Sequence, residues 1–201
     1  MSRFPIPAAD AAAPFQTEII IRRSRFLTHC AHTPGMEAAR AFVEQIRTKH
    51  ADATHNCWAF VAGAPGHSGQ VGFSDDGEPH GTAGRPMLQV LLHCVTRWFG
   101  GVKLGTGGLV RAYQDSVREN LATLPLAEKV PTVELDVELD YAHLDRLHRL
   151  LPAFEARVCA EAYDQAARVR ICLPEALRGP FEEAIAGRTD GRARCTLAEE
   201  V

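Results

Sequence analysis

The sequence predicts an α+β protein of two domains, and three observations support this prediction. Residues 133–140 alternate between apolar and acidic side chains, as expected for a strand with one buried face. From this strand onward the pattern follows the order β-α-β-β-α-β, which is ferredoxin-like. A composition break at Pro125–Pro131 separates it from a longer mixed segment. We therefore place the domains at residues 1–128 and 129–201.

β-Branched runs and helical spacing indicate the elements of the first domain. Residues 15–31 favour two strands joined at Arg22–Arg25. Thr33-Pro34 is a typical helix start, with Thr33 as the N-cap and Pro34 as the first helical residue. The remaining expected elements are strands at 55–62, 70–73 and 95–99, with helices over 82–93 and from the glycine-rich stretch to Leu124.

In the second domain a helix with Leu144, Leu147 and Leu151 on its apolar face follows the alternating strand. A turn at Asp164-Gln165 then joins two strands into a hairpin. The remaining expected elements are these strands at 157–163 and 168–173, a helix over about 174–186 and a strand at 193–197. Together they complete the ferredoxin-like order.

Composition excludes several classes of protein. The chain has 201 residues, of which 46% are hydrophobic and 23% charged, as in ordinary globular proteins. Its net charge of −3 means that any nucleic-acid contact must come from a local patch. Neither a transmembrane run nor a signal-peptide pattern is present, so we expect a soluble, cytoplasmic protein without a membrane partner. Six scattered cysteines without a C-x-x-C pair predict free, mostly buried thiols.

The stretch Arg97–Tyr113, RWFGGVKLGTGGLVRAY, places five glycines before an amphipathic helix. Glycine lets backbone N–H groups approach a ligand closely, and a helix N-terminus carries unpaired N–H groups and partial positive charge. With Lys103 and Arg111, the stretch is a candidate phosphate site, although its spacing matches neither common nucleotide-binding glycine motif. The glycines could equally allow close packing of the helix. The candidate phosphate- or nucleic-acid-binding residues are Arg97, Gly100, Gly101, Lys103, Gly105, Thr106, Gly107, Gly108 and Arg111.

Aromatic residues in the same stretch offer a second element of nucleic-acid recognition. Trp98, Phe99 and Tyr113 could stack on bases, while the periodicity of Tyr113 favours a place in the core. Arginines at 22, 23, 25 and 118 could extend the basic patch. The sequence therefore leaves open how much of this stretch is surface.

The second candidate segment is the acidic turn Ser74–Pro79, SDDGEP. Asp75, Asp76 and Glu78 could hold a divalent cation, but Asp-Gly and Glu-Pro are also ordinary turn chemistry, which we favour. His80, which follows the turn, is the histidine that we expect to be exposed. No serine or cysteine has a visible base beside it, so we assign neither catalytic residues nor a metal site.

Four segments resemble the IMPACT/YigZ family: SRF at 24–26, HNCWAF at 55–60, SDDGEPHGTAGRPM at 74–87 and the glycine-rich stretch. They occur in the family's order, and the resemblance covers essentially the whole chain. It implies an N-terminal ribosomal-protein domain 2-like α/β fold and a C-terminal domain similar to the last domain of elongation factor G. It also implies a link to translation or RNA, since the eukaryotic relatives regulate translation through a protein partner.

One departure from the family concerns the segment before the glycine-rich stretch. Family members carry a longer segment between GTAGRPM and FGG than the present chain. A central strand limited to Val95–Phe99 would be short for a sheet. We therefore expect that a segment is missing from the sequence at Cys94/Val95.

The sequence favours a cytoplasmic, translation-associated regulatory protein that needs no cofactor. It would bind RNA, the ribosome or a translation-linked protein through the glycine-rich loop and the acidic turn. Two alternatives stay open: a metal-dependent hydrolase that uses the acidic turn, and a module that only binds proteins. The sequence supports no assignment as an enzyme and does not indicate the oligomeric state.

Overall fold

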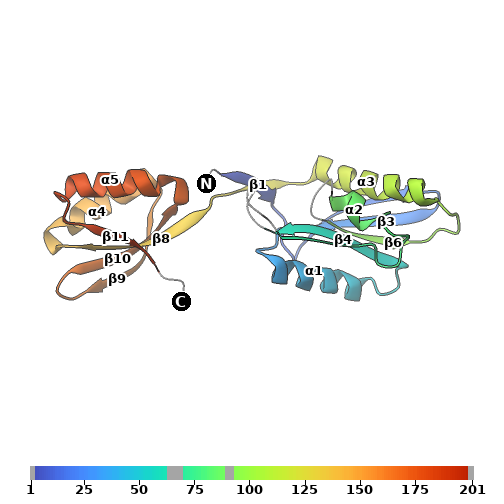
Figure 1. Cartoon of the computed structure of the whole chain (residues 1–201), viewed down its shortest axis with the longest axis horizontal. Helices are drawn as coiled ribbons and strands as arrows, with labels where there is room; N and C mark the ends of the chain where they lie inside the picture. The colour runs from blue at the N-terminus through green and yellow to red at the C-terminus, as the bar shows by residue number, and fades with distance from the viewer. Residues whose placement is uncertain (1–2, 63–69, 89–92, 199–201) are drawn as a thin grey trace. The chain divides into compact units, whose positions relative to one another are not determined.

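The computed structural model describes residues 3–62, 70–88 and 93–198. The chain divides into two compact units, residues 5–127 and residues 128–201 together with residues 1–4. Both units combine antiparallel sheets with helices, which confirms the predicted α+β class (Figure 1). None of the described helices is long and apolar enough to span a lipid bilayer.

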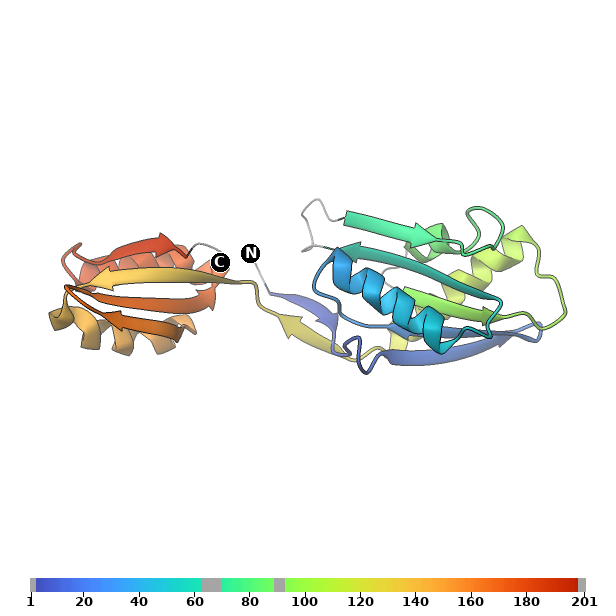
Figure 2. The ribbon, with the colours of Figure 1, turned by 90° about the horizontal axis from the view of Figure 1, so that it is seen from below.

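The first unit contains a five-stranded antiparallel sheet between two layers of helices. Helix α1 (Met36–Lys49) covers one face, and α2 (Gly84–Leu88) and α3 (Thr106–Thr123) cover the other (Figures 1 and 2). The strand order is β2-β3-β6-β4-β5. The strands are β2 (Phe15–Ile21), β3 (Ser24–Cys30), β4 (His55–Ala62), β5 (Gln70–Ser74) and β6 (His93–Trp98).

The central strands send alternate side chains to the two helical layers. Val95 of β6 packs with Tyr113 in the core beneath α2 and α3, whereas its neighbour Cys94 packs with Phe42 and Ile46 of α1. A strand that is buried on both faces needs apolar side chains at successive positions. This explains why β4 carries a continuous apolar run, CWAFVA at 57–62, instead of strict alternation.

Two helix boundaries differ from the prediction. Helix α1 begins at Met36, because Gly35 has φ of 111° and no side chain caps this end, so Thr33 is not the N-cap. Backbone at positive φ does not continue a right-handed helix. The helix expected over 82–93 is the short α2, and His93 already belongs to β6. Residues 89–92 of that prediction lie outside the described residues.

Strand β6 runs without interruption through Cys94 and Val95. Val95 pairs with Thr28 of β3 on one side and with Cys57 of β4 on the other, in registers that stay continuous across the bond. The expectation of a missing segment at Cys94/Val95 is therefore wrong. Because the strand starts at His93, its six residues reach the usual strand length.

The second unit has the ferredoxin-like order that the sequence predicts. Its antiparallel sheet has the order β11-β8-β10-β9, and α4 (Leu144–Leu150) and α5 (Arg178–Arg188) cover one face (Figure 1). The strands are β8 (Thr132–Leu139), β9 (Arg157–Tyr163), β10 (Ala167–Pro174) and β11 (Arg194–Leu197). Short 3₁₀ turns lie at 141–143, 151–154 and 175–177, and β1 (Phe4–Pro7) pairs with β7 (Leu126–Lys129) in a two-stranded sheet.

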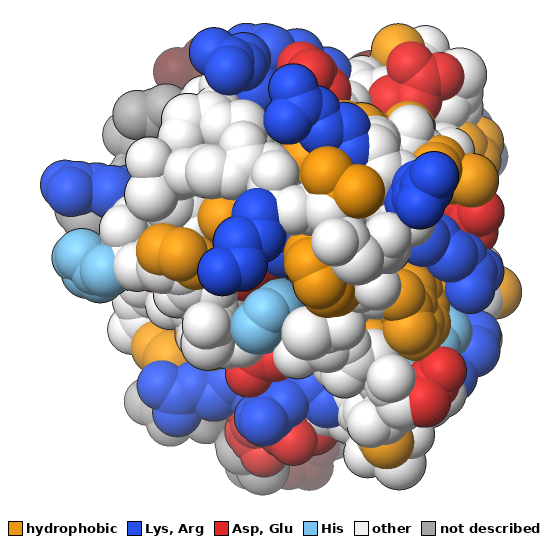
Figure 3. Space-filling view, turned by 90° about the vertical axis from the view of Figure 1, so that its right-hand side faces the viewer, with side chains coloured by type: hydrophobic (Ala, Val, Ile, Leu, Met, Phe, Trp, Pro, Cys, Tyr) orange, Lys and Arg blue, Asp and Glu red, His pale blue; other side chains and the backbone are white. Residues whose placement is uncertain are grey.

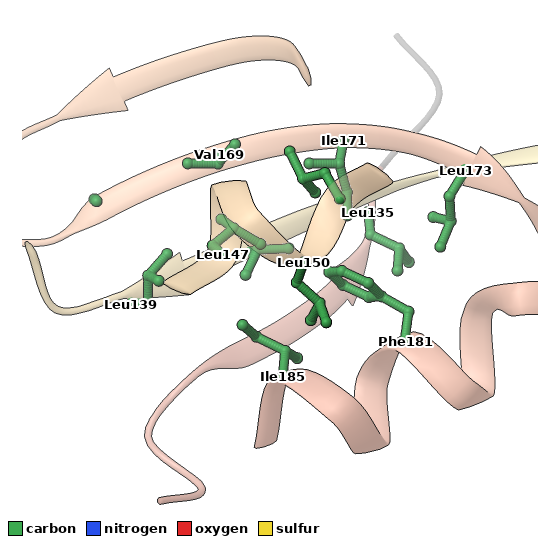
Figure 4. Packing of buried hydrophobic residues seen from close by; sticks show 12 residues of the cluster. Leu135, Leu139, Leu147, Leu150, Val169, Ile171, Leu173, Phe181 and Ile185 are labelled. Carbon is green, nitrogen blue, oxygen red and sulfur yellow. The ribbon is translucent and has the colours of Figure 1, made fainter. Parts of the chain in front are cut away.

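The core of the second unit lies between the sheet and the two helices. Leu135 and Leu139 of β8 point toward Leu147 of α4 and toward Phe181 and Ile185 of α5 (Figure 4). The acidic residues that alternate with these leucines face the other side of the sheet, as the alternation predicts.

Candidate functional site

The motifs singled out in the sequence meet at one end of the first unit. We call this the loop end. It comprises the β2–β3 turn (Arg22–Ser24), the acidic turn with the residues that follow it (75–83), and the glycine loop with the first turn of α3 (99–108). The three segments lie side by side beyond the ends of the strands (Figures 1 and 2). The backbone N–H of Gly100 donates to Oγ of Ser24 at 3.2 Å, and Glu78 forms an ion pair with Arg97 at the end of β6, so the three segments adjoin.

A buried polar network joins the motifs beneath the loop end. The Glu78 carboxylate forms an ion pair with Nη1 of Arg97, and both residues are less than one-tenth exposed. Tyr113 donates its hydroxyl hydrogen to Oε1 of Glu78 at 2.9 Å, and Nη2 of Arg97 donates to Oγ of Ser24 at 3.3 Å. Nε2 of His55 lies 3.8 Å from Oε2 of Glu78. One carboxylate thus connects four segments that are distant in the sequence.

The electrostatics of this network fix its hydrogen-bond directions. Burial, reinforced by Cys57 and Glu78, raises the pKa of the Tyr113 phenol, so the hydroxyl stays protonated and donates. Arg97 is 4% exposed, and its guanidinium lies over the rings of Phe26 and Phe99. Arg97 is therefore part of the core and not of the loop surface, which corrects its predicted role as a phosphate ligand.

The carboxylates of the acidic turn bind the backbone. Both oxygens of Asp75 accept N–H hydrogen bonds, from Gly81 at 2.8 Å and from Ala83 and Gly84 at 2.9 Å. Burial raises the pKa of Asp75, but these three bonds outweigh it and the pKa is lowered. Asp76, at φ of 41°, accepts the Asn56 N–H at 2.6 Å. Asp75 and Asp76 therefore stabilise the backbone of the turn, which is the turn chemistry that we favoured from the sequence.

Because the Asp75 and Asp76 carboxylates already accept backbone hydrogen bonds, the acidic turn is poorly suited to the metal site of the hydrolase alternative. Among the described residues, no group of three or more His, Cys, Asp or Glu side chains is arranged to hold a metal ion. Glu78, the third acidic residue of the turn, is engaged by Arg97 in the core. His80 is fully exposed, with its Nδ1 3.9 Å from Oδ2 of Asp75.

The glycines of the loop serve different purposes. A Cβ on Gly100 would lie 2.0 Å from the backbone of Arg23, so this glycine is required for packing. Gly101 and Gly105 adopt positive φ of 83° and 73°. A Cβ on Gly107, in the first turn of α3, would meet no heavy atom within 4 Å. Close packing thus explains Gly100, whereas the space beside Gly107 is open.

The exposed surface of the loop end is basic with apolar residues between the charges. Lys103 and Arg111 are exposed on either side of the start of α3, where Gly105 provides no side-chain cap. Phe99 is 46% exposed, whereas Tyr113 is buried and unavailable for stacking. Seen face-on, this end shows Lys and Arg side chains among apolar and uncharged groups, together with several Asp and Glu side chains (Figure 3). Of the remaining candidates, Gly101, Gly105, Thr106 and Gly107 are exposed, and Gly100 and Gly108 are half-buried.

A histidine pair in the first unit was not predicted from the sequence. His29 of β3 is fully buried, and its Nε2 lies 3.2 Å from Nε2 of His50, which follows α1. Burial, together with the charges of His50 and Lys49, lowers the pKa of His29 to about 4. Two histidines separated by a whole helix carry no spacing signal that would reveal this contact.

The His29 pair predicts a loss of stability in acid. The unfolded chain binds a proton at His29 near pH 6.5, whereas the folded chain binds it only near pH 4. Stability is therefore unaffected above pH 6.5 and falls between pH 6.5 and 4, by up to about 3 kcal/mol. Urea unfolding at pH 7.5 and 5 should show a smaller difference for His29→Gln than for the parent. The exposed control His80→Gln should retain the parent's difference; an equal difference in all three would contradict the assignment.

Comparisons with known proteins identify the family. The family model described as the Impact N-terminal domain matches residues 22–121, and a domain of unknown function (DUF1949) matches residues 137–192. The chain is 42% identical over 197 residues to the IMPACT family member YigZ of Escherichia coli, covering 94% of this chain and 97% of that protein. It is 35% identical over 184 residues to the IMPACT family member YvyE of Bacillus subtilis, covering 88% and 84%.

One solved structure is similar over the whole chain. It is described as the crystal structure of a hypothetical protein, is 40% identical, and superposes with a TM-score of 0.71 over all of both chains. The chain belongs to the IMPACT family. The resemblance found in the four sequence motifs is thereby confirmed.

Proposed function

We propose that this chain is a translation-associated regulatory protein of the cytoplasm that binds RNA, free or within the ribosome, through its loop end. The observation that carries the proposal is the start of α3. Lys103 and Arg111 flank its uncapped first turn, and the space beside Gly107 is open. Such a helix start combines unpaired N–H groups with positive charge, which is the chemistry that binds phosphate.

Further features of the loop end suit RNA more than a small anion. Phe99, in the same loop as Lys103, is 46% exposed, and single-stranded RNA is bound by aromatic stacking together with phosphate contacts. Arg22 and Arg23 are exposed on the adjoining β2–β3 turn. Because the whole chain carries a net charge of −3, this local concentration of cations must supply the attraction.

The buried network supports the proposal by holding the loop in place. Ser24, which accepts a hydrogen bond from Arg97, also accepts one from the backbone N–H of Gly100 at 3.2 Å. Glu78 therefore acts on the loop through Arg97 and Ser24. A preorganised loop loses less conformational entropy when it binds a ligand.

Removing both flanking cations should weaken RNA binding and reduce its salt dependence. We expect Lys103→Ala/Arg111→Ala to lower affinity for a single-stranded RNA oligonucleotide at least tenfold, because two cations no longer contact phosphate. Each lost phosphate contact should also reduce the slope of log K against log salt by about 0.7. Fluorescence anisotropy at several salt concentrations measures both quantities. Co-sedimentation with ribosomes at low and high salt tests whether the RNA that is bound belongs to the ribosome.

Arg118→Ala provides a matched control. Arg118 is an exposed arginine of the same helix, is paired with Asp115 at 3.2 Å and lies about three turns away from the helix start. It should change the affinity less than twofold. Absence of the parent from ribosomal fractions and failure to bind RNA at low salt would overturn the proposal. Capture of one defined protein through the same surface would then favour the protein-binding alternative.

A further inference from the structure

Two cysteines of the second unit meet across neighbouring strands. Cys159 lies on β9, the edge strand of the sheet, and Cys172 lies on the adjoining β10. The register shifts between Arg170 and Ile171, so that Ala160 pairs with Arg170 and Val158 with Ile171. Cys159 is the extra residue of this irregularity and has no Cα partner on β10. Such bulges redirect side chains, here a thiol at an exposed sheet edge.

The two thiols share one environment. The Cys159 thiol lies 4.0 Å from the Arg157 carbonyl oxygen. Nη2 of Arg157 donates to Sγ of Cys172 at 4.0 Å. Cys159 is the exposed member of the six cysteines, whereas Cys172 is 6% exposed. An accessible thiol next to a shielded partner and a guanidinium is the arrangement of an attacking and a resolving thiol.

The remaining cysteines lack this combination. Cys30, Cys57 and Cys94 are buried in the first unit, and burial raises the thiol pKa of Cys30 and Cys94 to about 12. Burial likewise raises the pKa of Cys195 on β11 to about 11. These thiols stay protonated at physiological pH and are poor nucleophiles.

We propose that Cys159 and Cys172 form a reversible disulfide by exchange with a small-molecule disulfide such as oxidised glutathione. The Cys159 thiolate attacks one glutathione sulfur; a Cys159–glutathione bond forms, the glutathione disulfide breaks and one glutathione thiolate leaves. The Cys172 thiolate then attacks the Cys159 sulfur and displaces the second glutathione. The two cysteines lose two electrons and two protons, and the two released glutathiones take them up. This bond would tie β9 to β10 where their register is irregular.

The electrostatics set the pH dependence of the exchange. Desolvation, together with Cys172 and Glu134, raises the pKa of Cys159, and the Arg157 charge opposes this. The thiolate fraction is therefore small at neutral pH, and the rate of exchange rises with pH. A disulfide at an exposed edge is of the labile type that the glutathione pool can reduce again.

The full-length chain, incubated in glutathione buffers of increasing oxidised fraction, tests the proposal. Intact-mass spectrometry should show the loss of two hydrogen atoms and no retained glutathione, and peptide mapping should find Cys159 joined to Cys172. Dithiothreitol should restore the original mass. A parent chain that stays unchanged, keeps glutathione on Cys159 or links another cysteine pair would overturn the proposal.

Single variants separate the two roles. Cys172→Ser should stop at the mixed disulfide, with one glutathione on Cys159, and Cys159→Ser should leave the chain unmodified under the same conditions. Because Cys159 is exposed, its variant does not disturb the core. Cys195→Ser, on the opposite edge strand of the same sheet, should behave as the parent. A Cys159→Ser chain that becomes glutathionylated at Cys172 as fast as the parent reacts would contradict the assigned order of attack.

Discussion

Replacing Glu78 with alanine should lower the free energy of unfolding by about 3–5 kcal/mol, because it leaves a buried charge without its partner. The guanidinium of Arg97 would stay in the core with no carboxylate, and the Tyr113 hydroxyl would lose its acceptor. Burying such groups unpaired costs far more than the intact pair contributes. Urea unfolding followed by circular dichroism measures the change.

An exposed ion pair gives the matched comparison. Glu138 on β8 is paired with Arg168 at 3.0 Å, and both side chains are more than two-fifths exposed. Glu138→Ala should therefore change stability by less than about 1 kcal/mol. The double variant Glu78→Ala/Arg97→Met should recover part of the loss, because it removes the uncompensated charge. If Glu78→Ala costs no more than Glu138→Ala, or the double variant loses the sum of both single effects, the network does not hold this end of the fold.

The link from Glu78 to function passes through the glycine loop. Ser24 accepts from Arg97 and from the N–H of Gly100, so the ion pair and the loop share one hydroxyl oxygen. A change at Glu78 should therefore disturb the RNA surface that we propose, although Glu78 itself is too buried to contact a ligand. The four motifs of the family are thus joined by the polar network around Glu78, whatever ligand the surface binds.

The order of elements could be predicted because local patterns determine it. The alternation over 133–140 indicates a strand with one buried face, and the apolar run at 57–62 indicates a strand between two helical layers. The end of α2 could not be predicted, because apolar residues continue at helical spacing into the stretch before His93. For the same reason the sequence predicted a strand at 95–99 instead of 93–98, and this led to the wrong inference of a missing segment.

Side-chain roles were harder to predict than elements. Arg97 lies in a basic, glycine-rich stretch, so the sequence predicts a surface cation. In the structure it forms a buried ion pair with Glu78 of another loop. The sequence favoured turn chemistry over metal binding for Asp75, but it did not indicate which backbone amides its carboxylate accepts; these are the N–H groups of Gly81, Ala83 and Gly84. Such contacts depend on the tertiary approach of distant segments, which residue spacing does not encode. Lys103 and Arg111, the two cations of the candidate phosphate site, are exposed.

Alanine at Gly100 and at Gly107 should have opposite effects, although the two glycines belong to one motif. At Gly100 the new Cβ would lie 2.0 Å from backbone atoms of Arg23 and 2.4 Å from the Ser24 nitrogen, so the loop must move. We expect Gly100→Ala to lower the unfolding free energy by about 3 kcal/mol, at the upper end for overpacking, because backbone cannot yield as a side chain does. The thermal transition and urea midpoint measure this loss.

At Gly107 no heavy atom lies within 4 Å of the new Cβ, and the residue is in the first turn of α3. Alanine there should be neutral or stabilising by about 0.5–1 kcal/mol, because it reduces the entropy of the unfolded chain and favours the helix. If RNA phosphates approach the backbone at this turn, as we propose, the same methyl group should weaken RNA binding severalfold in a chain of undiminished stability. A Gly107→Ala chain with parental RNA affinity would assign this glycine to the helix alone, and the phosphate contacts would then belong to Lys103 and Arg111 without the backbone.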